Sequence, residues 1–161
     1  MTIHSGHPFP TDDDPVRRLR GRVTSRVSLW TTSEAGLTVS SLMVANGDPA
    51  RVLGLLDPDS DLAESLEAGA PLVVQLLSWR HRATAEAFAG VAPAPGGPFR
   101  TAEFEDTGWG RRLLDATTWA GVRVESVEPR GWSVLVTATV EHVVAGEDDE
   151  PLFHHRGRFH R

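Results

Sequence analysis

The sequence has no cysteine in its 161 residues. The chain therefore has no disulfide, no thiolate nucleophile and no cysteine-bound metal cluster. It also lacks an apolar run near the roughly 20 residues that a transmembrane helix needs. Its first residues, MTIHSGHPFPTDDD, do not follow the basic-then-apolar order of a signal peptide. These observations predict a cytoplasmic protein that makes no contact with a membrane.

Several catalytic motifs are missing as well. The sequence contains no Gly-x-Ser-x-Gly elbow, which argues against a hydrolase triad. It also contains no P-loop and no Gly-x-Gly-x-x-Gly, which argues against a nucleoside triphosphate site and a Rossmann site. The net charge is −6 and the basic residues are dispersed, so we expect no nucleic-acid partner. His154, His155 and His160 could suggest a metal, but neighbours in a strand point to opposite faces. We expect no metal site.

The composition is that of an ordinary globular chain. Apolar residues make up 40% and charged residues 24%, and the length fits one domain. Residues 1–14 have little to bury and are predicted to form a flexible arm, so that the domain spans residues 15–161. Asp14 followed by Pro15 predicts a short helix over residues 15–20 that ends at Gly21. Its arginines could reach a phosphate or could form a solvated face.

The most informative stretch is residues 36–56, GLTVSSLMVANGDPARVLGLL. Its pattern predicts a strand over residues 37–45, a turn at residues 46–49 and a second strand over residues 51–56. Ser40 and Ser41 are unusual core residues, because each buried hydroxyl needs a partner. Since neighbours alternate between faces, the two side chains should not both reach one ligand atom. The stretch favours a site that binds an anion or the polar edge of a ring.

The rest of the chain reads as strands with a few helices. We expect a first strand over residues 22–32, with Val27 and Leu29 on an apolar face and Ser28 and Trp30 on a polar one. A helix with Asp61 as its cap should follow the central stretch. Further expectations are a strand at 71–77, a helix within 78–90, a long excursion at 91–110, a helical turn at 112–116, strands at 117–128 and 132–145, a solvated hairpin tip at 147–150 and a closing strand at 151–161.

The order of these elements resembles that of the flavin reductase-like family, the flavin-binding split barrel. The resemblance rests on Gly-x-Thr-x-Ser-Ser at residues 36–41, an Asp-Pro turn at 48–49, Val-Gln-Leu-Leu at 74–77, Phe-Ala-Gly at 88–90 and Pro-Leu-Phe-His-His-x-Gly-x-Phe at 151–159. It implies a mainly β fold with flanking helices, an antiparallel split β-barrel of six or seven strands.

The resemblance also implies a function. Members bind FMN or FAD without a covalent bond, commonly across a homodimer interface, and pass hydride from NAD(P)H to the flavin. Reduced flavin often serves a partner monooxygenase, and no general acid or base is required. This chain is thus expected to be an NAD(P)H:flavin oxidoreductase. The alternatives are a flavin-binding protein without free-flavin reductase activity and a structural barrel without flavin.

The candidate site follows from the same comparison. Hydroxyls and a guanidinium would bind the flavin phosphate, small and apolar residues would line the ring, and Phe99, Phe104 and Trp109 would cover it. Where many members have Gly-Asp-His, this chain has Arg130-Gly131-Trp132, so Trp132 would stack on a ring or block the nicotinamide. Arg26 could instead form a rim ion pair, and Trp79 could be core. The candidate cofactor-binding residues are Arg26, Thr38, Val39, Ser40, Ser41, Leu42, Ala45, Asn46, Trp79, Arg82, Phe88 and Trp132.

Overall fold

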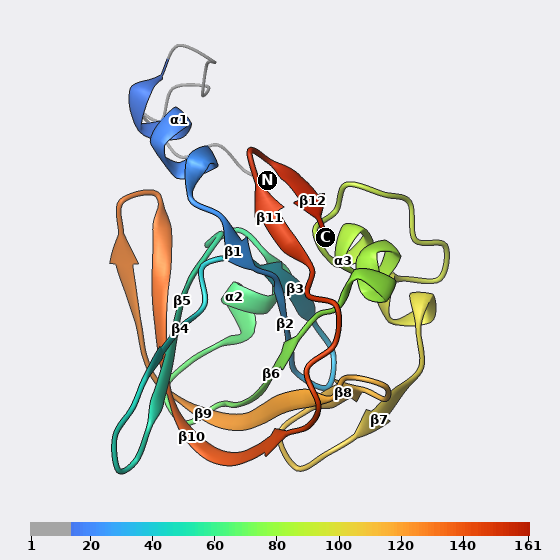
Figure 1. Cartoon of the computed structure of the whole chain (residues 1–161). Helices are drawn as coiled ribbons and strands as arrows, with labels where there is room; N and C mark the ends of the chain where they lie inside the picture. The colour runs from blue at the N-terminus through green and yellow to red at the C-terminus, as the bar shows by residue number, and fades with distance from the viewer. Residues whose placement is uncertain (1–13) are drawn as a thin grey trace.

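Two long strands run through the middle of the main sheet, along the lower part of the view in Figure 1. The computed structural model describes residues 14–161, so the predicted arm over residues 1–14 lies outside the described residues except for Asp14. β9 (Thr118–Arg130) and β10 (Ser133–Ala145) pair antiparallel through a two-residue turn whose Gly131 has a φ of 57°. The left-handed conformation there favours glycine. The pairing register skips Glu125, which marks a bulge in β9.

Seven antiparallel strands make up the main sheet, which confirms the predicted split-barrel-like fold. The sheet is curled but not closed into a barrel. Its strands, in spatial order, are β3 (Gly36–Val39), β2 (Ser28–Thr31), β6 (Pro71–Leu76), β9, β10, β5 (Arg51–Leu56) and β4 (Met43–Ala45). Two smaller sheets contain β1 (Ser25–Arg26), β11 (Phe153–His155) and β12 (Arg158–His160), and β7 (Phe104–Asp106) with β8 (Arg111–Leu113).

The two edge strands of the main sheet are joined by three residues, Ser40, Ser41 and Leu42. β3 pairs only with β2 and β4 only with β5, although β3 and β4 are consecutive in sequence. A link this short can join the two edges only if the sheet curls until they lie close together. We call residues 40–42 the seam. The single strand predicted over residues 37–45 is therefore wrong, because the chain changes its pairing partner at the seam.

The helices are short and lie around the sheet (Figure 1). They are α1 (Pro15–Arg22), α2 (Asp61–Ser65), α3 (Arg82–Phe88) and the 3₁₀ turns η1 (Trp79–His81) and η2 (Pro98–Thr101). The Asp14 carboxylate accepts from the Val16 N–H at 3.0 Å, which confirms the predicted cap of α1, but the helix continues through Gly21. In α2 the cap is Ser60, not Asp61, since the Ser60 hydroxyl accepts from Ala63 N–H at 3.2 Å.

β2 is buried on both faces and separates two hydrophobic cores. Trp30 points into the curled sheet, whereas Leu29 packs against α3, β8 and the C-terminal segment. The predicted polar face of this strand is therefore wrong. Ser28 is buried too, and its hydroxyl donates to Val39 O at 2.8 Å and accepts from Trp30 Nε1 at 3.0 Å. Both polar groups are thus satisfied, as a buried position requires.

Three further sequence expectations need correction. Residues 111–113 form β8, paired with β7, rather than part of a helical turn. The expected strand over residues 22–32 is two short strands, β1 and β2, which belong to different sheets. The C-terminal segment is a hairpin, β11 and β12, around a turn at Arg156 and Gly157. It pairs with β1 instead of closing the main sheet, because β1 leaves the main sheet before β2 begins.

Candidate functional site

The seam opens onto a groove of about 530 Å³ between the main sheet and the small sheet β1–β11–β12. This volume falls in the range of about 300–1,000 Å³ that small-molecule sites occupy. The residues that line this seam groove are Arg17, Arg20, Gly21, Val23, Ser25, Ser40, Ser41, Leu55, His154 and Gly157. They combine hydroxyls, a guanidinium and apolar walls. Because the seam has left both neighbouring ladders, its backbone is not used by sheet pairing.

The two serines of the seam have different roles. Ser41 Oγ donates to Leu55 O at 3.0 Å and accepts from Leu55 N–H at 2.8 Å, so this hydroxyl replaces a strand in pairing with β5. Within residues 14–161, no hydrogen bond involves the Ser40 side chain. The Ser40 hydroxyl is therefore not committed within the described fold, while Ser41 fixes the position of the seam.

His154 and Arg20 form the polar side of the groove opposite the serines. Burial lowers the pKa of His154, and the positive charges of Arg20, His155 and His160 lower it further. A neutral imidazole can donate and accept one hydrogen bond each, which suits the polar edge of a heteroaromatic ring. Arg20 supplies a permanent cation at the same wall.

The structure places the other sequence-predicted residues behind or away from the seam groove. Thr38 Oγ1 donates to Ala85 O at 2.7 Å. Val39 and Leu42 pack in the hydrophobic core that contains Trp30, inside the curled sheet. Ala45 and Asn46 are exposed at the outer edge, in β4 and its turn. None of these side chains lines the groove, so Ser40 and Ser41 are the two predicted seam residues that do.

The residues predicted around η1 and α3 form a separate aromatic cluster. Phe88 packs edge-on against Phe99 at 5.0 Å and against Phe104 at 6.0 Å between ring centroids. The guanidinium of Arg82 lies 4.4 Å from the Trp79 ring centroid. Phe99 and Phe104 pack against the second hydrophobic core, the one that contains Leu29. The resemblance implied that Phe99 and Phe104 cover the flavin ring. In the structure these two side chains hold α3 against the sheet.

Two other predicted residues lie in distinct places. Trp109 stacks on His142 with ring centroids 5.3 Å apart, and its Nε1 donates to Glu141 at 2.8 Å. Trp132 is 52% exposed at the β9–β10 turn. Neither side chain lines the seam groove.

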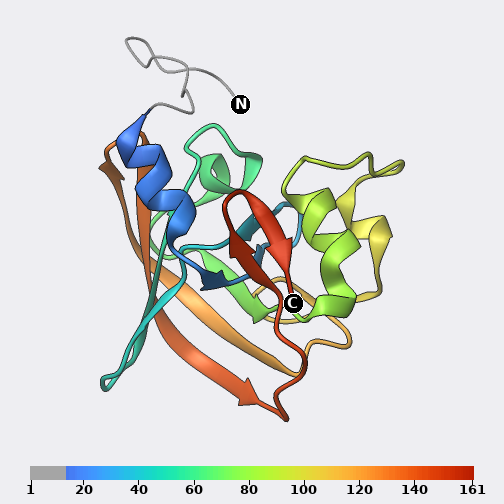
Figure 2. The ribbon, with the colours of Figure 1, turned by 45° about the horizontal axis from the view of Figure 1, so that its top comes forward.

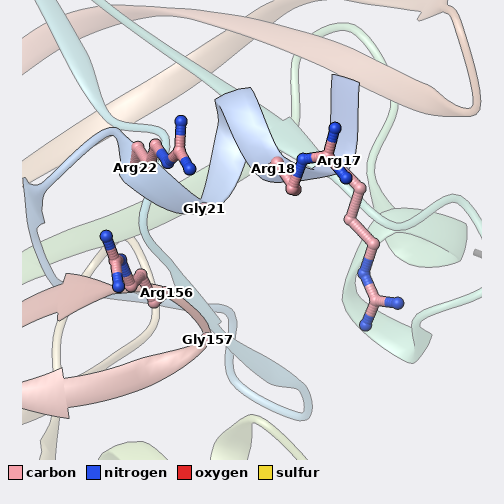
Figure 3. A pocket seen from close by; sticks show the side chains of 6 residues that line it. All are labelled: Arg17, Arg18, Gly21, Arg22, Arg156 and Gly157. Atoms are coloured by element: carbon pink, nitrogen blue, oxygen red, sulfur yellow. The ribbon is translucent and has the colours of Figure 1, made fainter. Parts of the chain in front are cut away.

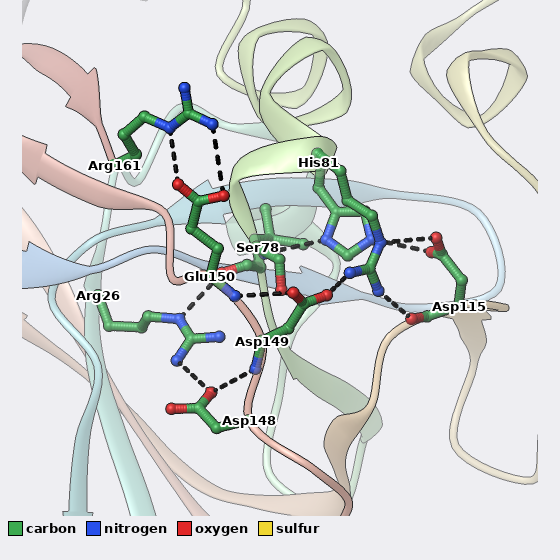
Figure 4. Close-up of polar contacts among 10 residues, drawn as sticks. Arg26, Ser78, His81, Asp115, Asp148, Asp149, Glu150 and Arg161 are labelled. Atoms are coloured by element: carbon green, nitrogen blue, oxygen red, sulfur yellow. Dashed lines mark hydrogen bonds and ion pairs between the residues drawn. The ribbon is translucent and has the colours of Figure 1, made fainter.

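Arg26 is engaged in a network of charges below the small sheet (Figure 4). Its Nε donates to Leu77 O at 2.9 Å and its NH1 pairs with Asp148 at 3.2 Å. Nearby, Arg80 pairs with Asp149, and Arg161 with Glu150 at 2.6 Å. Three of the four acids at residues 147–150 are thus paired with arginines, although Glu147, Asp148 and Glu150 stay exposed, as the sequence predicts. The segment is not a hairpin tip, because it joins β10 to β11 in a different sheet. The Arg26 guanidinium forms the ion pair that the sequence left open.

His81 is the most buried titratable group of this network, with 5% of its side chain exposed. Its Nδ1 accepts from Ser78 N–H at 3.0 Å, and its Nε2 lies 2.8 Å from Asp115 Oδ1. The first bond requires an unprotonated Nδ1, so Nε2 carries the proton and donates to the carboxylate. Burial lowers the pKa of His81 more than Asp115 raises it. With both nitrogens used, the ring serves structure and not proton transfer.

The sequence did not identify Val23, Leu55 or His154 as site residues. Leu55 carries a detectable signal, because it is an apolar residue on the outward-facing positions of β5, which alternate with the buried ones. His154 was weighed only as a metal ligand. Within residues 14–161 no group of three or more potential ligand side chains is placed to hold a metal ion. No helix in the same range is long and apolar enough to cross a membrane.

Comparison with known proteins agrees with this architecture. The NADH:FAD oxidoreductase SgcE6 of Streptomyces globisporus C-1027, solved with NAD and FAD fragments, has a TM-score of 0.82 at 19% identity, covering 93% of this chain and 92% of that one. The flavin reductase PheA2 has a TM-score of 0.81 at 22% identity, covering 94% and 98%. The styrene monooxygenase flavin reductase of Pseudomonas putida S12 has a TM-score of 0.78 at 22% identity, covering 90% and 95%.

At these identities the structural matches show the fold alone. A search of curated proteins found no match. The sequence model of the flavin reductase like domain matches residues 20–161, which is nearly the whole described chain. This protein belongs to the flavin reductase-like domain family.

Proposed function

We propose that the protein is a flavin reductase that binds FMN or FAD in the seam groove and uses NADH or NADPH as hydride donor. The observation that carries the proposal is the groove of about 530 Å³ at the seam, with the uncommitted hydroxyls of Ser25 and Ser40, a cation and apolar walls. This donor set fits an isoalloxazine ring and its phosphate-bearing tail. Membership of the flavin reductase-like family supplies the reaction class.

The residues of the groove would position the ligands. A bound flavin supplies the hydride-accepting chemistry, so the protein acts through proximity and orientation. Ser40 would donate to an acceptor on the flavin, and Val23 and Leu55 would exclude water from the ring. His154 would hold the polar edge from the other side. No side chain needs to transfer a proton, which agrees with the structural role of His81.

A homodimer and a monooxygenase that takes up reduced flavin belong to the same proposal. The edge strand β4 is exposed along its length, including Met43 and Val44. An exposed apolar edge strand is a surface that a second chain can cover. The relative from Pseudomonas putida S12 is named as the flavin reductase of a styrene monooxygenase, and a similar link to an oxygenase is proposed for this chain. The cytoplasmic location expected from the sequence remains part of the proposal.

An anaerobic assay tests the function directly. Trace protein is mixed with excess FMN and NADH, and the bleaching of oxidised flavin is followed, with FAD and NADPH exchanged in parallel reactions. Many equivalents of flavin bleached per protein would support the reductase. Flavin retained on the protein without turnover would favour the flavin-binding protein. The absence of both would leave a structural barrel.

A pair of variants locates the site. Ser40→Trp should fill the seam groove and abolish flavin binding, measured by quenching of flavin fluorescence, while the circular dichroism spectrum stays unchanged. Ser33→Trp, on an exposed loop away from the groove, is the matched control and should bind flavin normally. Unchanged affinity in Ser40→Trp would remove the flavin from this groove.

A further inference from the structure

The arginines of this acidic chain fall into two groups. Most of those in residues 14–161 have a partner. Arg17 and Arg18 belong to this group, and a carboxylate or an aromatic ring is the partner of Arg26, Arg51, Arg80, Arg82, Arg111, Arg112, Arg123, Arg130 and Arg161. Within the same range, no hydrogen bond, ion pair or ring contact involves the side chains of Arg20, Arg22, Arg100, Arg156 and Arg158. The second group is the informative one, because a chain with net charge −6 has carboxylates to spare.

Four of these five arginines gather in one place. Arg20 and Arg22 lie at the end of α1, and Arg156 and Arg158 lie at the turn of the β11–β12 hairpin beside it (Figure 2). The Arg156 N–H donates to Gly21 O at 2.6 Å, which joins the hairpin turn to the helix. Clustered like charges repel one another unless an anion balances them. The arrangement therefore indicates an anionic ligand.

A cavity of about 340 Å³ opens between the helix and the turn (Figure 3). We call it the arginine cavity; its lining residues are Arg17, Arg18, Gly21, Arg22, Arg156 and Gly157. Arg17, Gly21 and Gly157 also line the seam groove, so the two spaces adjoin. A single extended molecule could place one end in each.

The backbone at Arg156 is a second, independent observation. Its φ is 53°, and it is the one non-glycine residue in the described range 14–161 with a positive φ. Two-residue hairpin turns of this kind favour asparagine, aspartate or glycine, because other side chains are strained there. An arginine kept in a strained conformation points to a use for its side chain. Here the guanidinium is directed at the arginine cavity (Figure 3).

We propose that the arginine cavity binds the pyrophosphate of a dinucleotide whose ring end occupies the seam groove. This inference rests on the proposed function, which places a ring in that groove. Guanidinium groups bind phosphate oxygens through paired charge-assisted hydrogen bonds. Arg22 and Arg156 supply two such groups from opposite sides of the cavity. FAD and the nicotinamide dinucleotides all carry the required pyrophosphate, and ADP contains it without the ring end.

Direct binding of ADP, measured by calorimetry, tests the cavity without reference to catalysis. The affinity should fall about tenfold or more in Arg22→Gln and in Arg156→Asn, the usual scale for losing a charge-assisted bond. It should also fall between 50 and 200 mM salt, because salt screens exposed charges. Arg156→Asn suits the turn better than arginine, so this variant should remain folded.

Arg100→Gln is the matched control, since Arg100 also has no partner in the described range but lies on η2. It should bind ADP as the unmodified protein does. Equal ADP affinity in all variants, or no binding of ADP at millimolar concentration, would overturn the inference.

Steady-state kinetics separate the two sources of the pyrophosphate. If the occupant is FAD, ADP competes with FAD, and also with FMN because FMN carries one of the two phosphates, but not with the nicotinamide dinucleotide. Arg156→Asn then raises the KM for FAD and leaves the KM for the nicotinamide dinucleotide unchanged. If the occupant is the nicotinamide dinucleotide, ADP competes with it and Arg156→Asn raises its KM at unchanged kcat. If the arginine variants still reduce flavin and their KM values for flavin and for the nicotinamide dinucleotide are unaltered, the inference is contradicted but the proposed function is not. If the unmodified protein shows no turnover but binds ADP, and the variants lose that binding, pyrophosphate binding in the arginine cavity is supported and reductase activity is contradicted.

Discussion

The hydroxyl of Ser41 bonds to both backbone groups of Leu55, at 3.0 Å to the carbonyl oxygen and 2.8 Å from the amide. One side chain thereby takes the place of a neighbouring strand at the point where the chain crosses between the sheet edges. Leu55 and Ser41 both line the seam groove. The contact therefore fixes the main-sheet wall of the groove as well as the position of the seam.

Replacing Ser41 should affect stability, whereas replacing Ser40 should affect only binding. Ser41→Ala removes two hydrogen bonds and should lower the free energy of unfolding by about 1–2 kcal/mol. Ser40→Ala removes a hydroxyl with no partner among residues 14–161 and should leave stability within about 0.5 kcal/mol. Urea denaturation compares the two variants. Equal losses would show that the serines do not divide these roles.

Gly54 gives a sharper test of the curled sheet. A Cβ built at this position lies 2.7 Å from the Trp30 ring, far inside van der Waals contact. Gly54→Ala should therefore cost about 1–3 kcal/mol, the usual cost of overpacking a core. Gly108→Ala is the control, because a Cβ there meets nothing within 4 Å and its φ is not left-handed. A thermal melt in which both variants match the unmodified protein would contradict the tight approach of β5 to Trp30.

Sequence reasoning predicted the sheet well because alternation and turn residues are local signals. The strand at residues 71–76, the helix ending near Phe88 and the long late hairpin all follow from such signals. The seam does not. Leu37 to Ala45 has the composition of a continuous strand. Nothing local shows that Val39 and Met43 belong to opposite edge strands of the sheet, β3 and β4, which pair with different partners.

The partners of charged residues are harder still to predict. Residues 147–150 look like a solvated turn because four acids stand together. Their arginines come from β1, η1 and the C-terminus, at positions 26, 80 and 161. Contacts so distant in sequence depend on the completed fold. For the same reason the structure brings only Ser40 and Ser41 of the twelve candidate residues to the seam groove, and the assignment of the flavin site stays a prediction.

Arg26 allows the sequence-based site to be tested against the geometry. Arg26→Gln removes the ion pair with Asp148 and the bond to Leu77 O, and should lower stability by about 1 kcal/mol. Because the guanidinium does not line the seam groove, flavin affinity should be unchanged in a fluorescence titration. A clear loss of affinity in a folded Arg26→Gln protein would instead assign the phosphate contact that the sequence suggested.

Two histidines with lowered pKa values should make the protein lose stability in mild acid. Burial lowers the pKa of His81, against the opposing effect of Asp115, and Arg80 and Arg26 lower it further. Burial also lowers the pKa of His154. A histidine whose pKa is lower in the folded state binds its proton more readily when unfolded, so stability is complete above about pH 6.5 and declines as the pH falls below it. Each group contributes at most about 1.4 kcal/mol per pH unit.

Urea denaturation at pH 7.5 and pH 5.5 measures this loss, and variants assign it. His81→Gln keeps a donor for Asp115 but cannot be protonated, so it should lower stability at pH 7.5 and reduce the difference between the two pH values. His154→Gln should remove the rest of the stability difference, and the stability of the double variant should hardly change between pH 7.5 and pH 5.5. The acid loss caused by Asp115 does not interfere, because its pKa is lowered from an already acidic value. A double variant that retains the full difference would show that other groups control the acid sensitivity and that the Ser78 N–H bond does not hold His81 neutral.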